Sequence, residues 1–479
     1  MLLLLHALAC TSSAPDAPDN TVAEADTDTD TDSDTDTDTD TDTDSDTDTD
    51  QRRPIVIVMI GDGMGPEQLV AGSLYGWGEE GRLFIEQLPH QGEVVTSSLS
   101  GVTDSAASAT AMSAGVLTWN GVVGLDRDLE PVETLVELSH RLGLSAGVVT
   151  TAHVSHATPA AFTAHEENRS NYTVIAEDQV SMLPDVMMGG GRQYFRPSSE
   201  KESVREDDGL IAPLEAAGCS LVYTSAELSA HDPAAPGCLV GLFAEEHLDY
   251  MVERTKDTTQ PTLAELTLAA LERLDTDEDG FFLMVEGARI DMAGHSNSIR
   301  RLVEEVVAFD EAVAVAASWA VDRDVLLLVT ADHETGGLAV QSGGEAGELP
   351  EVTWEHPEHT NTRIRIFGQG GEAVAIDGQT VEHAWVHSLA QAHLEGSVFV
   401  PPVVASRVPD GRLSDLRHVA ALQSVESNMG VGWNQLESLR LDATEEGLYI
   451  GVEGIFSRDL GSVVVLIDRD LGEGTGLSS

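Results

Sequence analysis

Runs of consecutive apolar residues recur along the chain and alternate with segments of helical periodicity. A continuous run of this kind predicts a strand buried on both faces, which is typical of a parallel sheet. Four such runs are "PIVIVMIGDG" (54–63), "AGVVTTA" (146–152), "GFFLMVEG" (280–287) and "DVLLLVTADHETGG" (324–337). Helical patterns lie between them at 134–143, 262–274 and 298–320. The alternation predicts an α/β fold, a three-layer sandwich around a mostly parallel sheet.

Acidic and histidine side chains stand where these predicted strands end. Asp62 and Glu286 each follow an apolar run directly, and so does the pair formed by Asp332 and His333. In open α/β sheets the ligand crevice lies at the carboxyl ends of the strands. One such acid would usually be a helix cap or a turn residue. Because the feature recurs, it predicts a functional site at this edge of the sheet.

Past Pro401 and Pro402 the pattern changes to short runs in which apolar and polar residues nearly alternate. The runs are "LESLRLDAT", "GLYIGVEGIF" and "SVVVLIDRD". Alternation of this kind predicts short antiparallel strands. We therefore expect residues 401–479 to form part of a small accessory unit resembling a β-sandwich, with no visible chemistry.

The charge balance is strongly acidic, with 83 acidic against 25 basic residues and a net charge of −58. Such a chain repels phosphate backbones, so no nucleic-acid partner is expected. Every second residue from Asp26 to Asp50 is aspartate, and this run repels itself and has no apolar surface to bury. We expect residues 11–51 to be a disordered linker. The main globular domain is expected at 52–400.

The first ten residues, "MLLLLHALAC", form a short apolar stretch that ends in a cysteine. This stretch resembles the lipobox of bacterial lipoproteins, with Cys10 as the lipid acceptor, and an ordinary signal peptide is the alternative. No later stretch is long and apolar enough to span a bilayer. We expect export to the periplasm, the cell surface or the medium, with Cys10 as a candidate lipid anchor to the membrane.

Two further cysteines, Cys219 and Cys238, follow in the globular part. An oxidising exterior permits a disulfide between them, and two unpaired buried thiols are the alternative. The segment between them has neither CxxC spacing nor a nearby histidine pair, so no zinc site is predicted there.

One acidic segment fits a calcium-loop pattern. Positions 1, 3, 5, 6 and 12 of the pattern are filled by Asp275, Asp277, Asp279, Gly280 and Glu286. A calcium loop needs a helix on both sides, whereas the run that follows Gly280 is of the β type. We therefore predict an exposed turn from a helix to a strand. A calcium-dependent surface protein is the alternative that this segment and the acidic linker leave open.

The stretch "GVTDSAASATAMSAG" (101–115) places Ser105 at the start of a segment rich in small residues. Its hydroxyl would lie near a helix N-terminus, where free N–H groups and the helix dipole favour an anion. Asp104 and Ser105 are also common N-cap residues, so the pair alone indicates no particular chemistry.

Seven short motifs change that interpretation. In chain order they are "IGDGMG", "TDSAASATA", "HATPAAFTAH", "GGGRQYF", "EGARIDMAGH", "TADHETGG" and "EHT". Together they resemble the metal-dependent alkaline phosphatase family, over roughly residues 54–400. Seven ordered matches are far more specific than any single motif. The resemblance implies an alkaline phosphatase, a hydrolase of phosphate monoesters, that is commonly a homodimer.

The resemblance also implies a role for individual residues. Ser105 matches the nucleophile that becomes a phosphoserine, Arg169 matches the arginine that clamps the phosphate, and Asp104 matches its orienting partner. Two Zn²⁺ ions and one Mg²⁺ ion are implied as cofactors. Their implied ligands are Asp291, His295 and His359 for one zinc, Asp62, Asp332 and His333 for the other, and Asp62, Glu286 and Thr158 for magnesium. His156, also placed among the metal residues, and Met292 depart from one branch of the family and leave the third metal open.

The chemistry of these residue types agrees with the implied roles. Two zinc ions about 4 Å apart can activate a serine hydroxyl and stabilise the leaving oxygen. Mixed histidine and carboxylate ligands suit zinc, whereas an all-oxygen set suits magnesium. A phosphodiesterase or a related hydrolase of the same superfamily is the main alternative. A sulfatase is disfavoured because its CxPSR-like signature is absent around Ser105.

Overall fold

A computed structural model of the chain describes the backbone of residues 53–402, 418–422, 434–444 and 447–456, and the side chains of residues 53–402. The expected signal segment (1–10) and acidic linker (11–51) lie outside the described residues, and so does the run "SVVVLIDRD".

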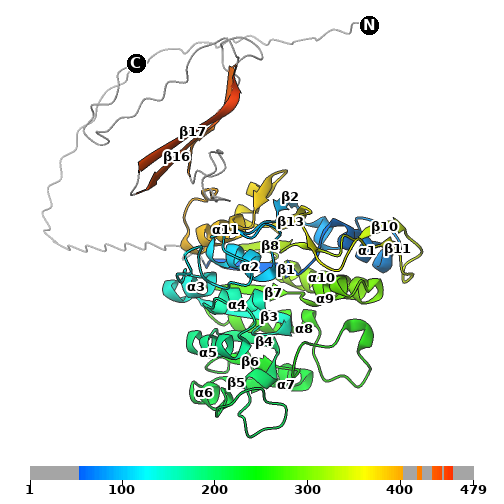
Figure 1. Ribbon diagram of the computed structural model, residues 1–479. Helices are drawn as coiled ribbons and strands as arrows, with labels where there is room; N and C mark the ends of the chain where they lie inside the picture. Colours follow the sequence, from blue (N-terminus) through cyan, green and yellow to red (C-terminus); the bar gives the residue numbers. More distant parts are fainter. Residues whose placement is uncertain (1–52, 403–417, 423–433, 445–446, 457–479) are drawn as a thin grey trace, which may run out of the picture. The chain divides into compact units, whose positions relative to one another are not determined.

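A ten-stranded sheet forms the centre of the described globular part (Figure 1). Its strands are β1 (Ile55–Gly61), β2 (His90–Val95), β3 (Ser145–His153), β4 (Val186–Gly190), β5 (Ser220–Val222), β6 (Leu239–Leu242), β7 (Phe281–Glu286), β8 (Val325–Ala331), β13 (Ile364–Gln369) and β14 (Thr380–Glu382). They are ordered β14-β2-β13-β8-β1-β7-β3-β4-β6-β5. The strands from β8 to β5 in this order are all parallel, and β13 is antiparallel to both of its neighbours. The predicted mostly parallel sheet is confirmed.

The four predicted strands are β1, β3, β7 and β8, which lie next to one another in the sheet. Every residue of β1, β7 and β8 is buried, which is why these strands consist of unbroken apolar runs. The register pairs Ile60 with Glu286, and Gly61 with Ala331. Since the strands run parallel and in this register, the polar residues at their carboxyl ends meet at one edge.

Helices cover both faces of the sheet, which gives the expected three layers. They are α1 (Pro66–Trp77), α2 (Ser105–Ala114), α3 (Leu135–Leu142), α4 (Ala157–Thr163), α5 (Tyr172–Met182), α6 (Ile211–Ala216), α7 (Ser225–Ala230), α8 (Leu263–Leu274), α9 (Arg289–His295), α10 (Ile299–Trp319) and α11 (Ala384–Glu395), with short 3-10 turns η1 (Ile85–Gln87), η2 (Arg192–Tyr194), η3 (Met251–Glu253) and η4 (Gly371–Ile376). Figure 1 shows α2, α3 and α4 on one side of the central strands and α8, α9 and α10 on the other. None of the described helices has the length and apolar character needed to cross a bilayer.

The predicted helix boundaries follow local capping chemistry. Thr134 and Glu137 form a reciprocal capping box at the start of α3, and Thr262 and Glu265 form another at the start of α8. Gly143 ends α3 in the left-handed conformation with φ of 80°. These short-range signals explain why α3 begins and ends, and why α8 begins, where the sequence predicts.

Smaller antiparallel sheets accompany the large one. β9 (Glu334–Thr335) pairs with β12 (His359–Thr360), and β10 (Ala339–Ser342) pairs with β11 (Glu351–Thr353). Near the C-terminus, β15 (His418–Leu422), β16 (Asn434–Thr444) and β17 (Gly447–Phe456) form a three-stranded antiparallel sheet. The runs "LESLRLDAT" and "GLYIGVEGIF" are therefore strands, as predicted, whereas β15 was not foreseen. A β-sandwich-like unit remains a prediction.

The calcium-like segment is a turn between α8 and β7, as predicted, because no helix follows it. Its carboxylates already have partners: Asp275 accepts a hydrogen bond of 2.7 Å from Arg53 and one of 3.0 Å from Arg323. Asp277 accepts one of 3.0 Å from the backbone N–H of Ser145. Glu286 lies at the far end of the buried strand β7. The calcium-loop interpretation is therefore wrong.

Cys219 and Cys238 form a disulfide, with their Cα atoms 4.3 Å apart. The bridge joins the residue before β5 to the residue before β6, at the edge of the large sheet. Of the two alternatives that the sequence left open, the structure has the disulfide.

Candidate active site

Asp62, Glu286, Asp332 and His333 meet at the carboxyl edge of the sheet, and all four side chains are fully buried. Two groups of possible ligand atoms form here, each with its atoms within 4.8 Å of one another. We call Asp62, Asp332 and His333 the first cluster, and Asp62, His156 and Glu286 the third cluster. Asp62 belongs to both, so the two clusters share one carboxylate. The second cluster is described below.

A glycine lets the chain turn tightly beneath the first cluster. Gly63 has a φ of 73°, and its N–H donates to Asp332 Oδ1 at 2.9 Å. A Cβ atom at this position would lie 2.7 Å from the Cα of Asp291. Any side chain here would therefore be strained and would also push α9 away from the site.

The second cluster contains Asp291, His333 and His359, again with ligand atoms within 4.8 Å of one another. His295 adjoins it, because α9 places His295 one turn after Asp291, with 3.3 Å between its Nε2 and Asp291 Oδ2. The pairing of β12 with β9 brings His359 to the same place, where its Nε2 lies 3.2 Å from His295 Nε2.

Backbone carbonyls determine which nitrogen each of these histidines offers. His359 Nδ1 lies 2.9 Å from the carbonyl of Thr103, and His295 Nδ1 lies 2.5 Å from that of Pro357. A carbonyl can only accept, so each Nδ1 must donate. When the rings are neutral, two Nε2 lone pairs then face each other and cannot hydrogen-bond. A cation between them satisfies both, so this pair of rings fits a metal site.

Thr335 orients the ring of His333 in the same way. This residue was not predicted from the sequence. Its hydroxyl donates to Asp291 Oδ1 at 2.5 Å, because a carboxylate cannot donate. The Thr335 oxygen is then free to accept from His333 Nδ1, 3.2 Å away. The Nε2 of His333 consequently points at Asp332 Oδ2, 3.1 Å away, and at Ser105 Oγ, 3.3 Å away.

Several buried polar atoms of the site have no hydrogen-bond partner among the described residues. They include both carboxylate oxygens of Asp62, Oε1 of Glu286, Oγ1 of Thr158 and Nδ1 of His156. Burial of unpaired carboxylates is costly, and a bound cation removes that cost. The donor atoms present therefore fit metal ions.

Without a cation, these groups hold protons instead. Burial raises the pKa of Glu286 to about 7, and burial together with Asp332, Asp291 and Glu286 raises the pKa of Asp62 well above its usual range. The Asp291 carboxylate raises the pKa of His295 to about 9. Metal binding at such a site displaces protons, so it is favoured as the pH rises.

The predicted catalytic trio lies against the clusters. Ser105 is the first residue of α2, and Asp104 is its N-cap, with Asp104 Oδ1 accepting from the N–H of Ala107 at 3.0 Å. The other oxygen of Asp104 accepts from Arg169 Nη1 at 3.0 Å. Arg169 Nη2 in turn lies 3.4 Å from His156 Nε2. Asp104 is thus both a helix cap and the partner of an arginine.

The structure brings every predicted site residue into one contiguous region, although their roles remain predictions. Thr158 enters it on α4, two residues after His156, and lies beside Glu286. A second missed residue is Thr150, whose hydroxyl donates to Glu286 Oε2 at 2.5 Å. Its position near the end of an apolar strand is the same signal that marked Asp62, so the sequence could have indicated it.

Comparisons with known proteins agree with this geometry. A sequence model described as alkaline phosphatase matches residues 54–348. Alkaline phosphatase 3 of Bacillus subtilis is 36% identical over 302 residues, which are 60% of this chain and 63% of that protein. The matched part is thus less than two thirds of that relative's length.

Solved structures also match. The cold-active alkaline phosphatase from the psychrophile Shewanella sp. has a TM-score of 0.64 and 29% identity, covering 71% of this chain and 99% of that one. A variant of the alkaline phosphatase from the Antarctic bacterium TAB5, with aspartate in place of a histidine and Mg bound in its M3 site, has a TM-score of 0.63 and 28% identity. It covers 72% of this chain and 99% of that one.

Proposed function

This chain belongs to the alkaline phosphatase family, and from that premise we propose that it hydrolyses phosphate monoesters through a phosphoserine at Ser105. The observation that carries the proposal is the position of Ser105 Oγ, 3.3 Å from His333 Nε2 at the start of α2. Ser105 is 2% exposed, so its hydroxyl is held at the buried junction of the first and second clusters.

The side chains around Ser105 suit a phosphate group. The Arg169 guanidinium presents a planar fork that two phosphate oxygens can accept from, and Asp104 holds it in place at 3.0 Å. The free N–H groups at the start of α2 add further donors for an anion. Charge that develops on the phosphoryl oxygens is thus met by fixed donors.

The proposed reaction has two displacements. Ser105 Oγ bonds to phosphorus as the bond to the ester oxygen breaks; the serine proton passes to solvent, and the leaving oxygen takes a proton from solvent and departs as the alcohol. Water then attacks the same phosphorus, which releases inorganic phosphate and restores the hydroxyl of Ser105. Arg169 contacts the phosphoryl oxygens in both steps, so its contribution is to orientation and to charge stabilisation.

Two zinc ions are proposed. The ligands of one would be Asp62, Asp332 and His333, the residues of the first cluster. The ligands of the other would be Asp291 and His359 of the second cluster together with the adjoining His295. When bound, zinc would lower the pKa of the serine hydroxyl and neutralise charge on the leaving oxygen. Magnesium is proposed for the third cluster, through oxygens of Asp62, Glu286 and Thr158. In the TAB5 structure with magnesium bound in the M3 site, aspartate replaces a histidine. Here the imidazole of His156 stands at that cluster.

The proposal extends to the location and assembly of the protein. Residues 1–10 would direct export, with Cys10 as the lipid acceptor. A homodimer is proposed from the family alone.

Replacing the nucleophile tests the proposed reaction. Ser105→Ala should abolish hydrolysis of p-nitrophenyl phosphate, while Ser113→Ala, in the same helix and bonded to the carbonyl of Ala161 at 2.5 Å, should retain it. Parallel assays with a phosphate diester and metal analysis of the purified protein distinguish a monoesterase from a diesterase. Full activity of Ser105→Ala would refute the proposal.

A further inference from the structure

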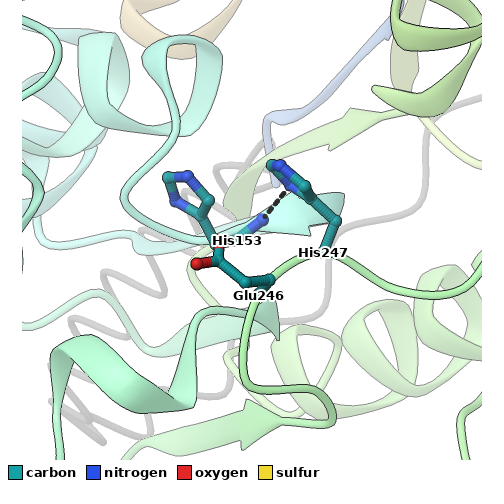
Figure 2. Close-up of side chains that lie close together, drawn as sticks. All are labelled: His153, Glu246 and His247. Atoms are coloured by element: carbon teal, nitrogen blue, oxygen red, sulfur yellow. Dashed lines mark hydrogen bonds between the residues drawn. The ribbon is translucent and has the colours of Figure 1, made fainter. Parts of the chain in front are cut away.

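A fourth group of possible ligands lies outside the residues assigned above. His153 ends β3, and Glu246 and His247 come from the loop between β6 and η3. Their ligand atoms lie within 4.8 Å of one another. Figure 2 shows the three side chains gathered at this point. The backbone N–H of His153 donates to His247 Nδ1 at 3.3 Å. We refer to these residues as the fourth cluster.

The fourth cluster adjoins the third cluster through His156. The ring of His156 meets the ring of His153 edge to face, with centroids 5.2 Å apart, and that of His247 in the same way at 5.6 Å. None of the three residues of the fourth cluster belongs to the other clusters. An ion bound here would therefore be separate from the two zinc ions and the magnesium ion proposed above.

His153 offers an unused donor. Its side chain is 2% exposed, and its Nδ1 has no hydrogen-bond partner among the described residues. The rings of Tyr172 and Tyr194 pack against it, with centroids 4.6 Å and 5.0 Å away, and hold its orientation. A buried imidazole nitrogen without a partner is costly, so this atom points to a missing ligand.

The other two side chains are positioned to bind. His247 stacks on His153 with ring centroids 4.9 Å apart. Its Nδ1 accepts a bond of 3.3 Å from the backbone N–H of His153, and a bound cation would replace that N–H as the partner of the single lone pair of the neutral ring. Glu246 is exposed, and its carboxylate accepts from Gln193 and, at 3.3 Å, from Tyr194. Each carboxylate oxygen has two lone pairs, so Glu246 keeps capacity for a metal while these neighbours orient it.

The backbone of the loop is already anchored. The N–H of Gly191 donates to the carbonyl of Glu246 at 2.7 Å, and the N–H of Leu248 donates to that of Thr151 at 3.0 Å. Both bonds join the loop to the ends of β3 and β4, next to His153. The donors are thus presented by a fixed backbone, which is what a metal site requires.

We propose that His153, Glu246 and His247 form a fourth metal site that takes zinc. Two imidazoles and one carboxylate are a donor set that binds zinc and leaves a fourth position open to water. The exposed Glu246 gives the ion access from solvent. The bound ion would join the β6–η3 loop to the end of β3 and hold the imidazoles that pack on His156.

Metal counting on matched variants of the full chain tests the proposal. Wild type, His247→Ala, Glu246→Gln and, as a control, His231→Ala are dialysed against zinc and magnesium and then against metal-free buffer, and bound zinc is measured by elemental analysis. His231 belongs to none of the four clusters. We expect each of the first two variants to hold one zinc ion fewer per chain than wild type, and His231→Ala to hold the same number.

Equal zinc content in wild type, His247→Ala and Glu246→Gln would overturn the proposal. Glu246→Gln guards against misfolding as an explanation, because the side chain is exposed. The amide oxygen can still accept from Gln193, and the amide N–H can donate to the hydroxyl of Tyr194. The result is a difference between chains, so it does not depend on the proposed phosphatase reaction. Hydrolysis of p-nitrophenyl phosphate by the same wild-type preparation shows separately whether that reaction holds.

Discussion

Replacing Thr335 with valine removes one hydroxyl from the centre of the candidate site and keeps the shape of the side chain. Thr335 is fully buried, donates to Asp291 Oδ1 at 2.5 Å and accepts from His333 Nδ1 at 3.2 Å. Thr335→Val leaves the Nδ1–H of His333 without an acceptor and one oxygen of Asp291 without a donor. Both are proposed zinc ligands, so we expect weaker zinc binding.

The size of the expected loss in zinc affinity depends on how strong the hydrogen bonds of Thr335 are in the metal-free and in the zinc-bound protein. A hydrogen bond to a charged group contributes about 1.5–3 kcal/mol. Thr335 makes its bonds in the metal-free protein as well, so only the gain on metal binding affects affinity. Loss of such orienting partners typically lowers metal affinity 10–100-fold, which corresponds to about 1.4–2.7 kcal/mol. We expect Thr335→Val to fall in this range.

The assay is a competition for zinc between the protein and a chelator of known affinity, with bound zinc measured at each free concentration. Thr267→Val is the matched control, because Thr267 is also fully buried but bonds only the carbonyl of Leu263 in its own helix, at 2.8 Å. Thr335→Ser keeps the hydroxyl and should restore most of the affinity. Zinc affinity of Thr335→Val within twofold of wild type would refute the reasoning.

Three further predictions concern phosphate binding and stability. Arg169→Ala should lower kcat/KM for a monoester roughly 100-fold and weaken inhibition by phosphate, because the guanidinium that Asp104 orients toward the phosphoryl oxygens is removed; unchanged phosphate inhibition would contradict this. Replacing Cys219 and Cys238 together by alanine, which opens a loop with a separation of 19 residues, should lower the free energy of unfolding by about 3 kcal/mol in urea titrations, and unchanged midpoints would count against it. Burial raises the pKa of Glu305 from 4.5 to about 7, so the folded chain keeps a proton that the unfolded chain releases, and this contribution to stability is lost as the pH rises from 4.5 through 7. Glu305→Gln should therefore make the free energy of unfolding less steep between pH 5 and pH 8, and parallel pH profiles of variant and wild type would rule this out.

Much of the site was predictable because it depends on strand ends. Asp62, Glu286 and Asp332 each follow a buried apolar run, and in-register parallel strands bring such residues to one edge. Ser105 was predictable for a similar reason, since a run of small residues after an N-cap residue marks a helix start. Periodicity and capping act over a few residues, so they can be recognised in a sequence.

Other parts of the site have no comparable signal. The carbonyls of Thr103 and Pro357 orient His359 and His295. Every residue type has a backbone carbonyl, so the amino-acid sequence does not mark the two residues that do this. Nothing in the sequence marks Thr335 or His247 as part of a site. Thr335 lies in β9, whose pairing with β12 places it near the second cluster. The path of the β6–η3 loop places His247 beside His153. Contacts of this kind depend on where distant segments meet.

The sequence by itself determined the α/β architecture, the ends of the main strands and helices, and the family, because these depend on local apolar patterns and on ordered motifs. Only the tertiary structure decided that Cys219 and Cys238 pair, that the carboxylates of the predicted turn at 275–280 bind arginine and backbone, and that His153 meets His247. These outcomes require segments far apart in the chain to come within a few ångströms. That approach is set by the packing of the whole sheet and its helices rather than by neighbouring residues.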